Sequence, residues 1–284
     1  RASIPFDARR SGFVMGEGPL WDDRRGCLFF VDIEGRKLNR VTMEGETTSY
    51  PMPSRIGTVG LTQSGRLIIA LEDGLHFFDP DTGRDEFFVQ PEDGRPENRG
   101  NDGKPDPAGN MWLGTMPMVQ DKVGGLYRIA PDGSSRCVID GLGCANGLGW
   151  SPDGKTMYFI DTPSRAVWAF DYDEKAGEID LNSRRTVVDF TGFAPEEGGP
   201  DGMTVDAEGK LWVAQWGGCR VCRYDEITGE KLMQVDVPAP CTTCPTFGGE
   251  KLDKLFITTA GFGKEKFPEA GSLFVADVGV CGRK

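Results

Sequence analysis

Residues 145–161 read ANGLGWSPDGKTMYFID, and this stretch contains the unit from which most of the chain is built. An apolar segment leads into the Pro-Asp-Gly turn at 152–154, and a second apolar run, MYFI, follows it. Pro, Asp and Gly are typical of tight turns, and two short apolar runs on either side of such a turn are typical of antiparallel strands. The stretch therefore predicts a β-hairpin.

The turn and the apolar strand after it recur six times, as RRGCLFFVD, QSGRLIIAL, PAGNMWLGT, PDGKTMYFID, AEGKLWVAQ and EKLDKLFITT. The first apolar residue of each strand serves as a marker, and these markers are Leu28, Leu67, Met111, Met157, Leu211 and Leu255. The intervals between markers are 39, 44, 46, 54 and 44 residues, about 45 on average. A period in this range is typical of propeller blades.

Each repeat holds further strands on both sides of the marked one. A second alternating run follows it, as in GLHFFD or AVWAFD, and an apolar segment such as GLTQS or GMTVD precedes it. No amphipathic stretch of helical period is long enough to connect parallel strands. We therefore predict an all-β, six-bladed β-propeller, with four antiparallel strands per blade and a single domain over residues 1–284. A β-sandwich with coincidental spacing is the alternative.

The charge balance argues against several classes of partner. The chain of 284 residues has 32 basic and 44 acidic residues, for a net charge of -12. Such a surface repels phosphate backbones and anionic lipids, so we expect no nucleic-acid or membrane partner. The longest apolar runs, Cys27–Val31 and Leu67–Leu71, are far shorter than the roughly 20 residues that span a bilayer. No secretory leader pattern opens the sequence, which favours a cytoplasmic protein.

Eight cysteines allow a zinc site, disulfides or reduced thiols. Cys219-x-x-Cys222 and Cys241-x-x-Cys244 have a separation that formally fits structural zinc. However, Cys219 and Cys222 lie in GGCRVCRYD, which alternates like a strand, and strand residues three apart point to opposite faces. Reduced thiols are therefore the prediction.

Two further motifs suggest chemistry that their surroundings do not support. Residues 149–156, GWSPDGKT, match the phosphate-loop pattern, but a strand follows where that loop requires a helix. His76 is the only histidine, and its place in LHFFD predicts a partly exposed strand residue. A single histidine also excludes catalytic zinc sites with two or more histidine ligands. Catalysis must then rest mainly on carboxylates, amides, arginines or lysines.

Four oxygen-bearing side chains occupy equivalent positions in four repeats, 10 or 11 residues before the marker. They are Glu17, Asn101, Asn146 and Asp201, in the contexts MGEGPLW, RGNDGKPD, CANGLGW and GPDGMTV. One Asx-Gly pair alone is a common turn element. Four such positions, where the innermost strands should begin and converge on the channel, instead predict a site for a hard cation.

The motifs GEGPLW, NDGKPDPAGNMWLGTM, NGLGWSPDGKTMYFIDT, PDGMTVDAEGKLWVAQWGG and PTFGG resemble those of the family of senescence marker protein 30 (regucalcin), gluconolactonases and related sugar lactonases. The resemblance covers nearly the whole chain. It implies a six-bladed propeller with one divalent cation in its channel, held by Glu17, Asn146 and Asp201. It also implies that Arg99 and Asn101 bind substrate. Oxygen ligands alone are compatible with Ca, Zn, Mn, Mg or Fe(II).

Two departures from the family pattern concern the substrate. Some relatives have acidic residues directly after G-T-M that reach the substrate, whereas here residues 117–119 are PMV. Asp121, a little further along, is the candidate for that role. The position before PTFGG, often Ser in the family, is Cys244. These differences leave the particular sugar open, but not the metal site.

The activity implied by the resemblance is metal-dependent hydrolysis of a sugar lactone to an aldonic acid. Asp201 is the candidate general base, and the cation polarises the lactone carbonyl. The partner is then a small sugar lactone, and we expect a monomer or weak homodimer. A phosphotriesterase-like hydrolase at the same site and a non-enzymatic calcium-binding protein are the alternatives. Strictosidine-synthase-like or luciferin-related chemistry is less favoured, because its C–N chemistry would need a different acid.

Overall fold

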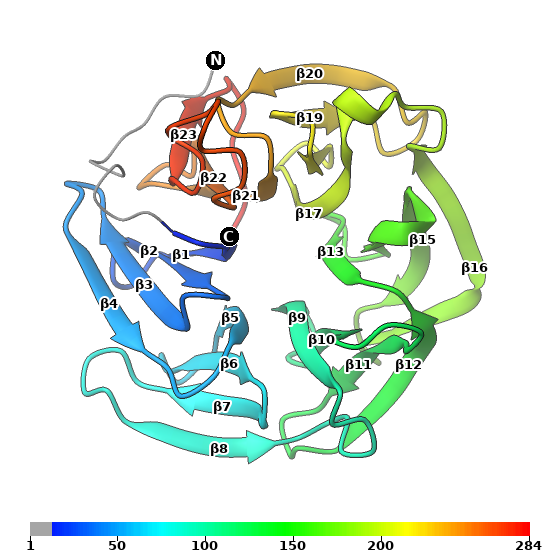
Figure 1. Cartoon of the computed structure of the whole chain (residues 1–284). Helices are drawn as coiled ribbons and strands as arrows, with labels where there is room; N and C mark the ends of the chain where they lie inside the picture. Colours follow the sequence, from blue (N-terminus) through cyan, green and yellow to red (C-terminus); the bar gives the residue numbers. More distant parts are fainter. Residues whose placement is uncertain (1–12) are drawn as a thin grey trace.

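Six antiparallel β-sheets are arranged in a ring around a central channel in the computed structural model, which describes residues 13–284 (Figure 1). Each sheet is one blade, with its strands in sequence order from the channel outward. The prediction of a six-bladed propeller is confirmed. Five blades have four strands, and the sixth has three within the described residues. The opening of the sequence, on which the expectation about a leader rests, lies outside the described part.

The first three blades lie in the blue-to-green part of Figure 1. Blade 1 consists of β1 (Gly16–Asp22), β2 (Cys27–Asp32), β3 (Lys37–Thr42) and β4 (Thr47–Pro51). Blade 2 consists of β5 (Ile56–Leu61), β6 (Leu67–Leu71), β7 (Gly74–Phe78) and β8 (Asp85–Val89). Blade 3 consists of β9 (Asn98–Pro105), β10 (Met111–Pro117), β11 (Gly124–Ile129) and β12 (Ser135–Leu142).

The last three blades complete the ring. Blade 4 consists of β13 (Ala145–Trp150), β14 (Thr156–Asp161), β15 (Ala166–Asp173) and β16 (Glu178–Asp189). Blade 5 consists of β17 (Gly199–Val205), β18 (Leu211–Trp216), β19 (Arg220–Tyr224) and β20 (Lys231–Asp236). Blade 6 consists of β21 (Thr242–Gly248), β22 (Lys254–Thr259) and β23 (Phe274–Asp277).

Helical structure in residues 13–284 is limited to two single-turn 3-10 segments, η2 (Thr162–Ser164) and η3 (Pro195–Glu197). Across these same residues there is no helix with the length and apolar character that a membrane span requires. The absence of crossover helices agrees with the antiparallel pairing of every blade.

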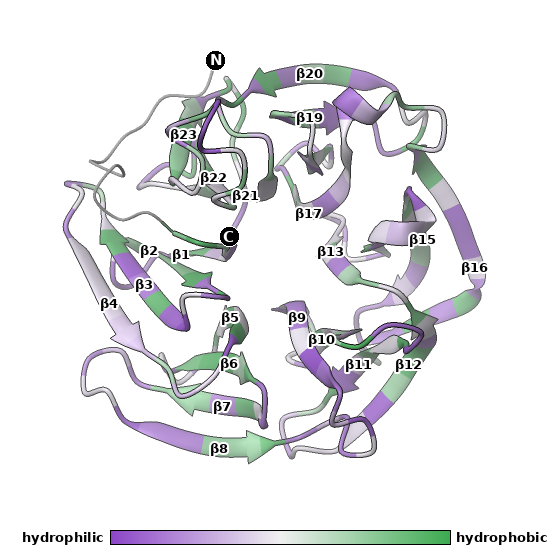
Figure 2. Ribbon diagram, viewed as in Figure 1, coloured by the Kyte–Doolittle hydropathy of each residue, from purple (hydrophilic) through white to green (hydrophobic). Residues whose placement is uncertain are grey.

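The core of the ring lies between neighbouring blades, and the marker residues belong to it. All six markers are buried and lie on the second strand of their blades. β2, β6 and β10 are covered on both faces by adjacent blades, which explains their nearly continuous apolar sequences. Outer strands such as β16 carry hydrophilic residues toward solvent (Figure 2).

Two equivalent hairpins are closed by the same side-chain contact. Asp106, after β9, accepts a hydrogen bond from the indole Nε1 of Trp112 at 2.8 Å. Asp206, after β17, accepts one from Trp212 Nε1 at 2.9 Å. Both indoles are fully buried, so the carboxylate supplies the partner that a buried N–H needs. The repeated sequence pattern thus fixes the first two strands of each of these blades relative to one another.

The phosphate-loop pattern forms a hairpin turn, as its surroundings predict. Ser151 Oγ donates to Asp153 Oδ1 at 2.6 Å, and the N–H of Thr156 donates to Ser151 Oγ at 3.0 Å. Strand β14 begins directly after the turn, at Thr156. No helix N-terminus is therefore present at this turn to bind a phosphate.

The prediction that His76 is partly exposed is wrong. Its side chain, on β7, is buried, with Nε2 2.7 Å from Asp73 Oδ1 and Nδ1 3.0 Å from Asp85 Oδ1. The ring of Phe87 on β8 packs against it edge-on. The outer strand β8 therefore covers a face that the alternation of β7 alone assigns to solvent.

All eight cysteines are free, which confirms the prediction of reduced thiols over disulfides. Cys219 lies in the turn before β19 with φ 53, whereas Cys222 is buried on that strand. Cys244, from the second C-x-x-C pair, instead lies beside two carboxyls in the channel, Glu17 and Asp102.

Gly57 is required where the inner strands of blades 2 and 3 meet. A Cβ at this position would lie 2.2 Å from the carbonyl oxygen of Gly100, which is backbone and cannot move alone. We expect Gly57→Ala to lower the free energy of unfolding by about 1–3 kcal/mol in urea titrations. Gly94→Ala is the matched control, because nothing lies within 4 Å of its Cβ, and its effect should stay below about 1 kcal/mol. Equal effects of the two substitutions would contradict this packing.

Candidate active site

The polar positions that the repeats predict lie at irregularities of the inner strands. In β13, Asn146 and Gly147 stand opposite the single residue Ile160 of β14, because the flanking pairs are Ala145–Asp161 and Leu148–Phe159. The pairing of β1, β9 and β17 with their neighbours shifts in the same way. Such bulges redirect side chains and are common beside functional sites. They bring residues from four blades to one region of the channel.

Glu17 and Asp201 form the centre of this region. Their carboxyl groups interact across the channel and shift each other's pKa, although β1 and β17 belong to different blades. The N–H of Gly18 donates to Glu17 Oε2 at 3.0 Å. Asp201 Oδ1 is buried and has no hydrogen-bond partner among residues 13–284. A buried oxygen without a hydrogen-bond partner lowers the stability of the folded state unless a proton, a ligand or a cation binds it.

Burial shifts the ionisation of both acids. The pKa of Glu17 is raised from 4.5 to about 8, first by burial and then by repulsion from Asp102. The pKa of Asp201 is raised well above its usual value, first by burial and then by the charge of Glu17. Two carboxyls that share such a site cannot both ionise freely without a compensating charge.

Two asparagines, Asn146 and Asn101, lie beside the carboxyl pair, and their hydrogen bonds determine the orientation of each amide oxygen and nitrogen. Asn146 Nδ2 donates to Thr162 Oγ1 at 2.7 Å, and this hydroxyl in turn donates to Pro200 O at 2.9 Å. Because the hydroxyl proton is used, Thr162 must accept from the amide nitrogen, which leaves Asn146 Oδ1 on the other side. Asn101 Nδ2 donates to that Oδ1 at 3.1 Å and to Ala145 O at 2.8 Å.

Arg99 lies at the same end of the channel as Asn101. Its Nη1 donates to Asn101 Oδ1 at 3.1 Å and to Gly100 O at 3.0 Å, and the side chain is buried. Burial lowers the pKa of this guanidinium, but arginine stays protonated. The structure thus brings Arg99 together with the two asparagines and the two carboxyls. Asp121 is different: it is exposed on the loop between β10 and β11, with φ 63.

Reasoning from the sequence missed Asp102 and Thr162, and it named Cys244 only as part of a C-x-x-C pair and as a departure from the family pattern. Asp102 is buried, and burial raises its pKa to about 6. It follows Asn101 directly, so strict strand alternation places it away from the channel, whereas the bulge at β9 lets both side chains contact other blades. The dipeptide Asn-Asp followed by Gly is the signal that predicts such an irregularity.

The donor set at the centre fits a divalent cation. Glu17, Asn146 and Asp201 present carboxylate and amide oxygens, which hard cations prefer. Asp201 has an unpartnered oxygen, and the pKa values of Glu17 and Asp201 are both raised. Metal-binding carboxyls have these properties when protons, and not a metal ion, balance their charge.

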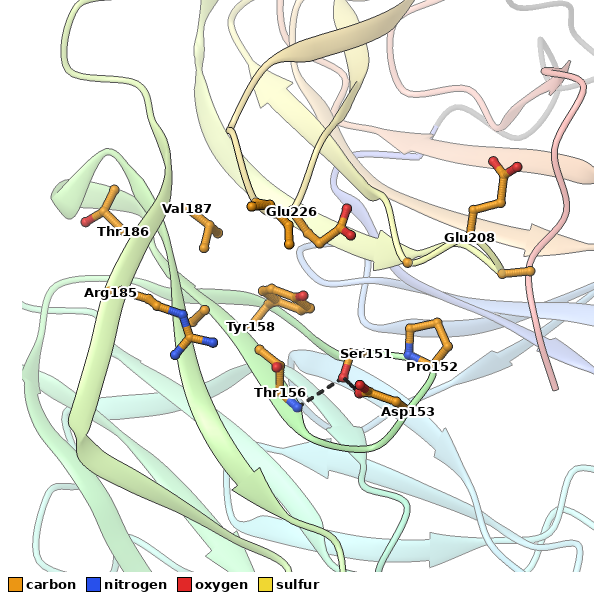
Figure 3. A pocket seen from close by; sticks show the side chains of 14 residues that line it. Ser151, Pro152, Asp153, Thr156, Tyr158, Arg185, Thr186, Val187, Glu208 and Glu226 are labelled. Atoms are coloured by element: carbon orange, nitrogen blue, oxygen red, sulfur yellow. Dashed lines mark hydrogen bonds between the residues drawn. The ribbon is translucent and has the colours of Figure 1, made fainter.

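A separate cavity of about 590 Å³ lies between blades 4 and 5, at the opposite end of their inner strands from Asn146 (Figure 3). Tyr158, Arg185 and Glu226 line it, together with the turn that carries the phosphate-loop pattern. None of the residues predicted to be functional lines this cavity. The channel is therefore the candidate active site.

The fold and this site define a six-bladed propeller with a buried cluster of oxygen donors in its channel. The chain belongs to the SMP-30/gluconolactonase family: residues 15–261 match the family model described as "SMP-30/Gluconolactonase/LRE-like region". A putative sugar lactone lactonase from Bacillus subtilis is 37% identical, over 93% of this chain and 91% of that protein. Regucalcin from Xenopus laevis is 36% identical, over 95% and 93%.

Solved structures agree with this assignment. A calcium-binding protein from Agrobacterium tumefaciens, named regucalcin, superposes with a TM-score of 0.89 at 31% identity, covering 96% of this chain and 92% of that chain. A gluconolactonase from Xanthomonas campestris has a TM-score of 0.78 at 24% identity, covering 97% and 88%, and this likeness concerns the fold alone.

The raised pKa of Glu17 predicts how the stability of the metal-free protein depends on pH. Because the folded-state pKa of about 8 lies above the ordinary 4.5, the stabilising contribution is complete below pH 4.5 and is lost as pH rises toward 8. Thermal unfolding in a chelator should therefore show a decrease in Tm across this window. Glu17→Gln should make the decrease smaller. An identical pH profile for the wild type and this variant would contradict the raised pKa.

Proposed function

We propose that the protein is a divalent-cation-dependent lactonase that hydrolyses sugar lactones to aldonic acids. The observation that carries the proposal is the buried Glu17–Asp201 carboxyl pair with one unpartnered oxygen beside Asn146, in a member of this family. The relative named as a putative sugar lactone lactonase supports the substrate class. One cation, Ca, Zn, Mn, Mg or Fe(II), would be held by Glu17, Asn146 and Asp201.

A cation bound there supplies Lewis-acid activation of the lactone carbonyl and stabilises the negative charge that develops on its oxygen. Asp201 takes the proton of the attacking water as that water adds to the carbonyl carbon. The bond between this carbon and the ring oxygen then breaks, and the proton passes from Asp201 to the ring oxygen, which becomes a hydroxyl. Water is consumed, and the product is one hydroxy acid.

Polar groups around the Glu17–Asp201 carboxyl pair would position the substrate. Arg99 and Asn101 would orient the hydroxyl or ring oxygens of the lactone, since both are held at the start of β9 by the contacts described above. Asp121, on the exposed loop of the same blade, would accept from sugar hydroxyls at the entrance. A neutral lactone is not repelled by a chain of net charge -12, whereas the anionic product is.

Two other activities make use of the same residues. A phosphotriesterase-like hydrolase would place a phosphoryl oxygen where the lactone carbonyl binds. A calcium-binding protein without catalysis would use the cation alone, and the similarity to the calcium-binding protein from Agrobacterium makes this worth testing. A pH-stat assay with aldono-lactones and phosphotriesters, after reconstitution with each metal, separates the three. Lactone turnover that needs no metal would contradict the proposal.

Asp201→Asn should lower kcat for lactone hydrolysis by about 10²–10⁴-fold, because the general base and one ligand are lost together. Asp189→Asn is the matched control, since Asp189 is exposed on the outer strand β16. Circular dichroism and thermal unfolding of both variants establish that they are folded. Full activity of Asp201→Asn together with Glu17→Gln would rule out this mechanism.

Arg99→Gln should lower kcat/KM about 10- to 100-fold, mainly through a higher KM, because a charged hydrogen bond to substrate is lost. Arg95→Gln serves as the control from the same blade, since Arg95 pairs with Asp140 at the surface. Steady-state kinetics on one aldono-lactone measure both. Equal effects in the two variants would mean that Arg99 does not contact the substrate.

A further inference from the structure

A second group of buried side chains includes Glu17 and two residues that take no part in the proposed hydrolysis. It consists of Glu17, Asp102 and Cys244, from the inner strands of blades 1, 3 and 6. Their possible ligand atoms all lie within 4.8 Å of one another, and all three residues are buried. Among residues 13–284 this is the one group of three or more Cys, His, Asp or Glu that meets this distance.

Asp102 has an oxygen available for a ligand. Its Oδ1 accepts a hydrogen bond from the N–H of Gly103 at 2.8 Å. Its Oδ2 is buried and has no hydrogen-bond partner within the described residues. The whole residue is 3% exposed, so water outside the protein cannot compensate for the missing contact. Oδ2 is therefore the Asp102 atom left for this group.

The thiol of Cys244 has room in the channel because its neighbour is glycine. A Cβ at Gly202 would lie 2.5 Å from both Cβ and Sγ of Cys244. Any larger residue would displace the thiol from its place near Glu17 and Asp102. Within residues 13–284 the hydrogen-bond partner of Cys244 Sγ is Pro245 O, at 3.6 Å, which is a weak contact.

The group is reached from the end of the channel opposite to Arg99. A cavity of about 310 Å³ is lined by Asp102, Cys244 and Lys104, and by residues further along the inner strands, such as Thr204 and Thr246. Lys104 Nζ donates to Leu148 O at 2.9 Å and to Met203 O at 2.7 Å. The lysine is thus held by carbonyls of blades 4 and 5, and its charge offsets part of the negative charge of Asp102.

We propose that Glu17, Asp102 and Cys244 form a second cation site, deeper in the channel than the oxygen-donor site and selective for thiophilic divalent ions such as Zn²⁺ or Co²⁺. A thiolate ligand favours these ions over Ca²⁺ and Mg²⁺. With bonds of about 2.0–2.3 Å, tetrahedral ligand atoms lie about 3.5 Å apart, so the group closes only slightly around the ion. Binding forms the metal–sulfur bond and releases the Cys244 thiol proton to solvent.

Glu17 belongs to both sites, so a thiophilic ion and the cation of the oxygen-donor site would share this carboxylate. The proposal goes beyond lactone hydrolysis and does not require it. Its test therefore uses a spectroscopic signal of the metal–thiolate bond. Titration with Co²⁺ gives thiolate-to-cobalt charge-transfer absorption in the near ultraviolet only where a cysteine binds the ion. Cys137→Ser/Cys281→Ser is the background, because these two cysteines are exposed.

In this background we expect a charge-transfer band that saturates at one equivalent. Cys244→Ser should abolish it, and Asp102→Asn should weaken Co²⁺ binding at least tenfold while the thiol remains. Cys241→Ser, from the same buried segment, is the matched control and should keep the band. Zn²⁺ should displace Co²⁺, and a hundredfold excess of Ca²⁺ should not.

Absence of the band, or its persistence in Cys244→Ser, would overturn the second site. An unchanged affinity in Asp102→Asn would also overturn it, even if Cys244→Ser does not fold. Lactone turnover measured on the same background protein keeps the two proposals apart. A Cys244-dependent band without turnover supports the second site and rejects the lactonase, and turnover without a band does the reverse.

Discussion

Three carboxyl groups are buried close together in the channel, and the rest of the fold must offset the cost of keeping them there. Burial raises the pKa of Glu17, Asp201 and Asp102, and repulsion from a neighbouring carboxyl raises the pKa of Glu17 and Asp201 further. Buried charges are stabilised only by close partners of opposite charge. The buried carboxylates can be compensated by protonation, by a bound metal cation or by the nearby charged side chains of Arg99 and Lys104. The channel therefore concentrates acidic side chains that a positively charged ligand would stabilise.

The energy to keep these groups together comes from the packing of the blades. Second strands such as β2, β14 and β22 are buried almost throughout, and clusters of apolar side chains join each blade to the next. The ring is closed by a bridge between Met15 and Ala260, which joins the start of blade 1 to blade 6. Because Glu17 follows Met15 by two residues, closure also places the first of the predicted ligands.

The sequence predicts the architecture and most of the site because both follow the same period. The apolar markers identify the second strand of every blade, and counting back from them finds Glu17, Asn101, Asn146 and Asp201. Cys244, 11 residues before the marker Leu255, is also reached by this count, but it carries a thiol in place of an oxygen donor. Asp102 escapes this reasoning because strict alternation does not allow neighbouring residues of one strand to share a face. The bulges that relax this rule are set by pairing between strands, which local sequence does not reveal.

The same limit explains the error at His76. Whether a residue on the third strand is exposed depends on how far the fourth strand extends beside it, and here Phe87 covers the imidazole. Thr162 is a further example, since its role in orienting Asn146 depends on Pro200 of the next blade. Contacts between blades decide these details, whereas the repeat within each blade decides the fold.

We propose that Glu17, Asn146 and Asp201 together bind a divalent cation in the channel. Anomalous diffraction from crystals grown with Mn²⁺ tests it most directly, because the peak locates the ion without reference to activity. We expect one strong peak within about 2.5 Å of oxygens from all three side chains. A channel with no peak at this position, in crystals that bind Mn²⁺ elsewhere, would contradict it.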